Sequence, residues 1–252
     1  MSKDRVKEEE VSEGLETYGE FKIEGKVEKT FDNVDLVMFR VDHNKYGYQR
    51  IENENIVIEK ILASDGPLLL GIFPVAPLNL PAEYATHMML KLTSPIVLDP
   101  KSHVDAYLTM PIEIAVVRST TTDVQMVDVF SLGKIKYALY GIPENGIICR
   151  YYETKINPEI PKTAPYKEAA LRVHFHNYTD KINTISRLVF PIKGADFYYR
   201  KHDAYYSDLE AIIESSLLQT FLRIDVSSGK WVADRTNMRQ KFDGKYLMAR
   251  GI

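Results

Sequence analysis

Two histidines with a spacing of two residues are candidate metal ligands. His174 and His176 lie in RVHFHNY, a stretch that alternates like a β-strand. Because alternate residues of a strand leave the same face, both imidazoles would lie on one face of a sheet. A complete site needs at least one further ligand, for which His87, His103 and Asp105 are the candidates. The alternative is a pair of solvent-facing histidines.

A second candidate is a polar site formed by Glu113 and Arg150. Glu113 lies in the apolar stretch MPIEIAVV, which is predicted to be a strand. A carboxylate on an apolar face has a raised pKa unless a cation pairs with it, and Arg150 or Arg118 could be that cation. A perturbed carboxylate in a cleft would mark a functional site, whereas a structural ion pair in the core is the alternative.

The single cysteine and the tyrosines offer weaker signals. Cys149 lies beside Arg150, and a nearby cation favours the thiolate. A nucleophilic cysteine also needs a positioned base, which no local sequence signature supplies, so we expect a small buried core residue. Tyrosine doublets at 151–152, 198–199 and 205–206 would send one ring to each face of a strand. An exposed row of such rings could stack on a sugar or a peptide.

Other catalytic and cofactor-binding motifs are absent from the sequence. The chain has no GxxxxGKS or GxxxxGKT loop and no GxGxxG, HExxH, GxSxG or CxxC pattern. The usual routes to nucleotide binding, zinc proteolysis, serine hydrolysis and thiol redox chemistry are therefore unsupported. No cofactor is indicated, apart from a divalent transition metal at the two histidines.

The elements that would position these residues are mostly β-strands. Alternating or short apolar stretches recur from Tyr18 onward, with Asn, Asp and Gly turn signals between them. This pattern predicts a mainly β fold, an antiparallel β-sandwich with little helix, built as two lobes or as one large double-sheet domain. The clearest hairpin is KIKYALYGI-PENG-IICRYY.

Proline and glycine mark the expected domain limits. The segment PVAPLNLP at 74–81 is expected to cross between sheets, because proline removes ladder donors from a central strand. The expected division is a flexible acidic arm at 1–17, a first β lobe at 18–155, a Pro-rich linker at 156–165 and a second β lobe at 166–252.

The segment from Ser207 to Ile224 permits two interpretations. Its apolar residues fit one face of a helix with a capping box at Ser207 and Glu210, but they also alternate like two strands broken at Ser215-Ser216. The β-rich surroundings favour the strands.

Composition limits the cellular setting. With 45% hydrophobic residues in 252, the chain can form a core without disulfides, and its one cysteine fits a reducing cytoplasm. The N-terminus lacks the apolar region of a secretory signal, and the longest apolar stretch, 67–82, is too short and too rich in proline to span a membrane. The net charge of -3 argues against a general nucleic-acid binder. The charge is uneven, however, because residues 1–20 are acidic and residues 230–250 are basic.

The stretch DVFSLGKIKYALYGIPENGIICRYYET at 128–154 resembles an uncharacterised archaeal protein family that is known only as a domain of unknown function. FPVAPLNLP, MPIEIAVV and NTISRLVFPIKG fit the same resemblance. It implies a cytoplasmic, single-chain β protein, and it implies no activity and no assigned site residues.

We therefore expect a binding or structural module for an unidentified protein partner or small ligand, held by a sheet face or by the interface between lobes. The alternative is a metal-dependent enzyme that uses His174 and His176.

Overall fold

The computed structural model describes residues 18–77, 85–119, 124–192, 197–214 and 217–222. Within these ranges the chain forms β-strands and no helix, so the prediction of a mainly β fold is confirmed. The described residues contain no helix that is long and apolar enough to cross a membrane. The acidic arm at 1–17 and the basic stretch at 230–250 lie outside the described residues.

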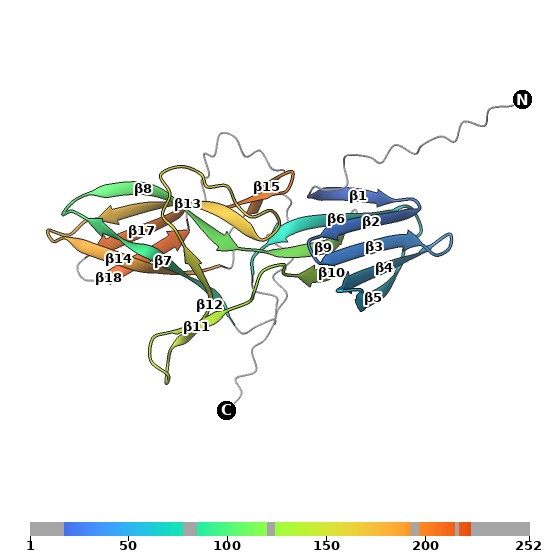
Figure 1. Cartoon of the computed structure of the whole chain (residues 1–252), viewed down its shortest axis with the longest axis horizontal. Coiled ribbons are helices and arrows are strands. Elements are labelled where there is room, and N and C mark those ends of the chain that lie inside the picture. The colour runs from blue at the N-terminus through green and yellow to red at the C-terminus, as the bar shows by residue number, and fades with distance from the viewer. Residues whose placement is uncertain (1–17, 78–84, 120–123, 193–196, 215–216, 223–252) are drawn as a thin grey trace, which may run out of the picture.

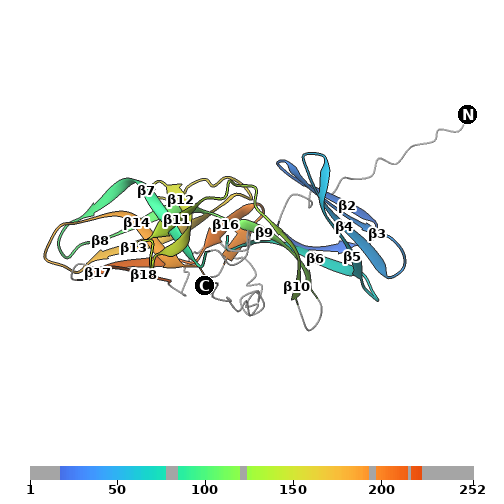
Figure 2. The same cartoon turned by 90° about the horizontal axis from the view of Figure 1, so that it is seen from below.

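A small sandwich lies at one end of the molecule (Figures 1 and 2). One of its sheets has the order β1-β6-β9-β10 and the other has the order β2-β3-β4-β5. Between them the rings of Phe31 and Phe130 meet at 5.9 Å, and the buried Asp128 accepts hydrogen bonds from Tyr48 and Arg50, both of 2.8 Å. The strands are β1 (Gly19–Ile23), β2 (Lys26–Phe31), β3 (Val34–Arg40), β4 (Lys45–Glu52), β5 (Asn55–Ala63), β6 (Leu68–Val75), β9 (Glu113–Ser119) and β10 (Val124–Phe130).

The other described strands form a large sandwich at the opposite end (Figure 1). One sheet has the order β11-β12-β7-β14, and the other has the order β15-β16-β13-β17-β18, with β8 paired to β13. The rings of Phe190 and Tyr206 meet between these sheets, with centroids 6.1 Å apart. The strands are β7 (His87–Leu98), β8 (His103–Pro111), β11 (Tyr137–Tyr140), β12 (Ile147–Thr154), β13 (Glu168–Asn177), β14 (Asn183–Pro191), β15 (Phe197–Arg200), β16 (Asp203–Tyr206), β17 (Leu209–Glu214) and β18 (Leu217–Leu222).

Both sheets of the large sandwich are mixed rather than purely antiparallel. Strand β12 runs parallel to β7, and β13 runs parallel to both β16 and β17. Side chains alternate with a period of two in parallel and antiparallel strands alike, so the sequence pattern could not tell the directions of partner strands.

The two sandwiches do not follow the expected lobes at 18–155 and 166–252. Strand β8 pairs with β13 and β7 pairs with β14, so strands on both sides of residues 156–165 share the sheets of the large sandwich. The small sandwich combines strands from 19–75 with strands from 113–130. A single cluster of buried apolar residues, from Tyr18 to Ile213, extends through both sandwiches.

Three local predictions can be compared with the strands. The hairpin is confirmed as β11 and β12, and the segment after Ser207 forms the strands β17 and β18 rather than a helix. Pro74, however, lies inside β6, which is a central strand. The proline is tolerated because the pairing of β1 with β6 ends at Ile72. On the β1 side of β6, the amide hydrogen that Pro74 lacks therefore removes no hydrogen bond between the strands.

Among the described strands the chain passes between the sandwiches three times, after β6, β8 and β10, and the crossing after β8 is the shortest. Only Ile112 separates β8 of the large sandwich from β9 of the small one. Glu113 begins β9, and its carboxylate lies 4.0 Å from the guanidinium of Arg150 on β12. These two side chains are 0% and 2% exposed, respectively. Removing one partner of such a pair leaves an uncompensated buried charge, so the pair strongly favours contact between β9 and β12.

Aromatic rings add to this junction. The ring of Tyr18, just before β1, lies 5.0 Å from Tyr166 and 5.8 Å from Tyr199, and both of these residues follow the crossing in sequence. Lys167 also reaches Asp32 of the small sandwich at 2.8 Å. The two sandwiches therefore meet through packed rings and charges.

We expect Arg150→Met to lower the free energy of unfolding by about 3–5 kcal/mol, because it leaves the Glu113 carboxylate buried without its cation. Adding Glu113→Gln should recover part of that loss. Urea unfolding would measure both variants. The control is Arg187→Met on the exposed face of β14, which should change stability by no more than about 0.5 kcal/mol. An equal loss in Arg150→Met and Arg187→Met would contradict a structural role for the pair.

Candidate functional site

The two histidines lie on one face of β13, as the spacing predicts. In the strand register His174 is opposite Asp105 of β8, and His176 is opposite His103. The apolar neighbours Val173 and Phe175 point to the opposite face and are fully buried in the core. The histidine-bearing face is therefore the outer face of the large sandwich.

His174 belongs to a chain of polar side chains on that face. Its Nδ1 lies 2.7 Å from Asp105, whose other carboxylate oxygen binds Arg172. Its Nε2 is buried, makes no hydrogen bond, and lies 3.6 Å from a carboxylate oxygen of Asp208. The hydroxyl of Tyr205 donates to the other oxygen of Asp208 at 2.9 Å.

The position of Asp208 follows from a break in the sheet. Strands β16 and β17 lie one after the other along the same edge of β13, pairing with it at Ala169–Ala170 and again from Val173 onward. The chain leaves the edge at Ser207 and Asp208, opposite the gap between these two pairings. Sequence spacing alone gave no sign that Asp208 would lie beside His174.

The charges in this set of polar side chains shift the pKa values of two of its members. Although partial burial raises the pKa of Asp105, hydrogen bonds from Arg172 and His174 outweigh it and hold that pKa below its usual value. Burial, followed by the nearby Asp208 charge, raises the pKa of Tyr205. The Asp105 carboxylate is therefore stabilised in its charged form.

His176 does not join His174 in a common site. Its ring stacks between His103 and Tyr178, with centroid distances of 6.0 and 5.6 Å. Of the other expected ligands, Asp105 binds His174 through Nδ1, and His87 lies in the other sheet. The described residues contain no group of three or more His, Cys, Asp or Glu side chains that could hold a metal ion. The geometry thus gives the metal hypothesis no support.

The other sequence candidates lie in the core. Arg150, one of the two expected cations, is the partner of Glu113, whereas Arg118 lies further along β9. Cys149 is fully buried, and this burial raises the pKa of its thiol. A protonated, inaccessible thiol is a poor nucleophile, so neither Glu113 nor Cys149 is placed to meet a substrate.

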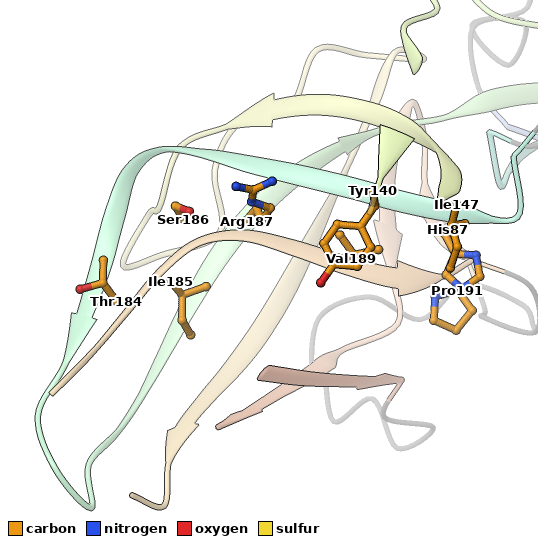
Figure 3. Close-up of a pocket in the computed structure, with 9 residues that line it drawn as sticks. All are labelled: His87, Tyr140, Ile147, Thr184, Ile185, Ser186, Arg187, Val189 and Pro191. Atoms are coloured by element: carbon orange, nitrogen blue, oxygen red, sulfur yellow. The ribbon is translucent and has the colours of Figure 1, made fainter. Parts of the chain in front are cut away.

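A groove that sequence reasoning did not identify lies on the outer face of the sheet β11-β12-β7-β14 (Figure 3). Its volume is about 620 Å³, within the range typical of ligand sites. Strand β14 forms one long side, while β11 and β12 close one end, where Tyr140 and Ile147 lie near Val189 and Pro191. The lining residues are His87, Tyr140, Ile147, Thr184, Ile185, Ser186, Arg187, Val189 and Pro191.

The strand register explains which side chains line the groove. Directly paired residues on neighbouring strands share a face of the sheet, and three such rows cross β12, β7 and β14. The rows are Cys149, His87 and Pro191, then Tyr151, Met89 and Val189, then Glu153, Lys91 and Arg187. Residues between these rows, such as Met88 and Phe190, are buried between the two sheets. The groove is thus apolar beside the hairpin, where Val189 and Pro191 lie, and it carries Arg187 near the middle of its length, with Lys91 and Glu153 in the same row of the sheet face.

The β11–β12 hairpin carries apolar side chains into solvent. Its loop closes where the amide of Gly146 donates to the carbonyl of Ile142 at 2.6 Å, and a Cβ at Gly146 would lie 2.7 Å from that oxygen. Gly141 has a φ of 106°, which L side chains rarely adopt. The exposed residues are Tyr137, Leu139, Tyr140, Ile142, Ile147 and Ile148, which are 38–57% exposed.

One sequence signal could have pointed to this surface. Both arms of the hairpin lack the alternation with polar residues that is usual where one face of a strand is in solvent. The same pattern also fits two ordinary strands, so it does not by itself distinguish an exposed apolar hairpin from a buried one.

We expect Asp105→Asn to lower the urea midpoint near pH 7, and we expect this difference to shrink below the usual Asp pKa of about 3.9. The pKa of Asp105 is lowered in the folded state, so its stabilisation is complete above the unfolded-state pKa and is lost as the pH falls through the folded-state value. Asp180→Asn is the control, because that exposed carboxylate pairs with Lys101 at 3.2 Å in solvent. A difference that stays constant with pH would contradict the assignment.

Comparisons with known proteins bear on the family and not on the site. No curated protein and no solved structure matches this chain. The sequence profile described as "Protein of unknown function (DUF432)" matches residues 17–241, which include all the described strands. The expected resemblance to a domain of unknown function is confirmed in that form, and the chain belongs to this family of proteins of unknown function.

Proposed function

We propose that this protein is a binding module that holds an extended segment of a partner protein in the outer groove of its large sandwich. The observation that carries the proposal is an elongated groove beside a hairpin whose large apolar side chains are exposed. Contiguous exposed apolar surface on a folded domain commonly marks a site of protein interaction.

The shape of the groove favours an extended segment over a compact ligand. Its lining follows β14 from Thr184 to Pro191. At a rise of about 3.3 Å per residue, these seven steps span about 23 Å, which matches a peptide strand of similar length. Extended peptides bind through side-chain pockets that match alternate residues, and the paired rows of the groove floor provide such a periodic surface.

The exposed hairpin supplies the apolar wall. Tyr140 and Ile147 are 44% and 40% exposed and lie at one end of the groove. Tyrosine offers large contact area with few rotatable bonds, so ordering it on binding costs little entropy. Burial of these two side chains by a partner would remove apolar surface from water without any change in the fold.

A metal-dependent enzyme built on His174 and His176 has less support. Asp105 occupies Nδ1 of His174, and His176 stacks on other rings. Nε2 of His174 faces a carboxylate of Asp208 rather than the groove, which lies on the other sheet.

We also propose a cytoplasmic location and an archaeal source, on the basis of the single cysteine and the sequence resemblance.

The test is selection of a random dodecapeptide display library on the immobilised full chain. We expect wild-type protein to enrich peptides that bind Tyr140→Ser/Ile147→Ser protein much more weakly, because the variant lacks the apolar wall. Both positions are exposed, so these substitutions should leave stability nearly unchanged. Surface plasmon resonance with individual enriched peptides would give the dissociation constants.

The matched control is Ile61→Ser on β5 of the small sandwich, which removes an isoleucine that is 61% exposed and lies far from the groove. This variant should bind the selected peptides as wild type does. No enrichment on wild type, or equal binding to the groove variant, would reject the proposed function.

A further inference from the structure

A pair of like charges lies on the groove's face of the sheet, level with the middle of the groove. Lys91 of β7 and Arg187 of β14 are directly opposite each other in the antiparallel register, and both are exposed. Side chains in such positions leave the same face with Cβ atoms about 5 Å apart, and like charges there destabilise a sheet. Among the described residues, neither cation forms an ion pair or a side-chain hydrogen bond.

The nearest carboxylate does not neutralise this pair. Glu153 is opposite Lys91 on β12, but its oxygen accepts a hydrogen bond from the Tyr151 hydroxyl at 2.7 Å. That bond, and then the charges of Lys91 and Lys136, hold the pKa of Glu153 below its usual value. The Glu153 carboxylate is thus shared by Lys91 and Lys136, and with Arg187 beside them this part of the groove face keeps an excess of positive charge.

Apolar surface lies immediately beside these cations. The next row of the groove floor consists of Tyr151, Met89 and Val189. Suppose that a carboxylate side chain of an extended partner segment binds at Lys91 and Arg187. The residue two positions along that segment points to the same face, so its side chain would lie over Val189 and the hairpin wall. Apart from Glu153 in the same row as these cations, no carboxylate is present among the described residues of the groove lining and floor.

We infer that the groove recognises an acidic, extended protein segment in which carboxylate and large apolar side chains occupy every second residue, on the face that meets the groove, the carboxylates pairing with Lys91 and Arg187. This inference rests on the proposed function and names the chemistry of its partner. Arg187 can bind a carboxylate through two parallel hydrogen bonds, and Lys91 adds a point charge beside it. Binding such a segment relieves the repulsion between the two cations as well as forming new ion pairs.

A nucleic acid also carries regular negative charge, but the groove fits it less well. The cations lie at one row of the groove only, and the rest of the described lining is aliphatic, hydroxyl or tyrosine side chains with one histidine. Backbone recognition of a nucleic acid needs basic groups along its path. We therefore favour the acidic peptide and make the nucleic acid an outcome of the test.

The test uses three fluorescein-labelled probes in anisotropy titrations with the full chain. The first is a decapeptide in which Glu and Leu take turns at every second position with Ser between them, so that both kinds of side chain share one face of an extended chain. The second has Gln in place of each Glu, and the third is a decathymidylate. We expect the Glu peptide to bind wild-type protein about three- to tenfold more tightly than the Gln peptide, because exposed ion pairs contribute modestly. Raising the salt concentration should reduce this preference.

Charge reversal assigns the preference to the groove. In Lys91→Glu/Arg187→Glu protein the Glu peptide should lose its advantage over the Gln peptide. The control Lys22→Glu/Lys26→Glu changes the net charge equally, at exposed positions on the small sandwich, and should keep the preference.

The outcomes separate this inference from the proposed function. Equal binding of the two peptides, a preference that survives the groove reversal, or tighter binding of decathymidylate would overturn the acidic segment as partner. If both peptides still bind and both are lost in Tyr140→Ser/Ile147→Ser, the binding groove stands without its charge preference. If neither peptide binds, both proposals are rejected.

Discussion

The buried ion pair between Glu113 and Arg150 is the constraint on which the two-sandwich arrangement depends. It lies where the chain crosses from β8 to β9, with one residue between the strands. Two charges in a core are tolerated only when they remain together, because separating them leaves each without compensation. The pair therefore links a strand of the small sandwich to a strand of the large one, and it holds β12 beside the start of β9.

The position of β12 in turn determines the groove. Arg150 faces inward, so Tyr151 beside it lies on the opposite face and begins a row that crosses β7 and β14. The hairpin beyond Arg150 extends past the edge of the core, and for this reason its apolar residues find no interior to fill. One inward-facing charge thus sets the face of the groove and the exposure of its wall.

Much of the local structure could be predicted from particular residues. Alternation in RVHFHNY placed His174 and His176 on one face of a strand, and the PENG loop indicated the hairpin. The carboxylate in MPIEIAVV indicated an arginine partner, although two arginines remained candidates. The groove and the contact between His174 and Asp208 could not be predicted, because both depend on strands that are distant in sequence.

By itself, the sequence determined which segments are strands and which side chains share a strand face, because the two-residue period and the turn residues are local properties. Only the tertiary structure decided which strands are neighbours, which pairs run parallel, and where the chain crosses between sandwiches. Those choices are made by packing and by buried charges between residues far apart in the chain. For the same reason, the expected boundary at 156–165 did not separate the sheets, whereas the chain crosses between the two sandwiches after β6, β8 and β10.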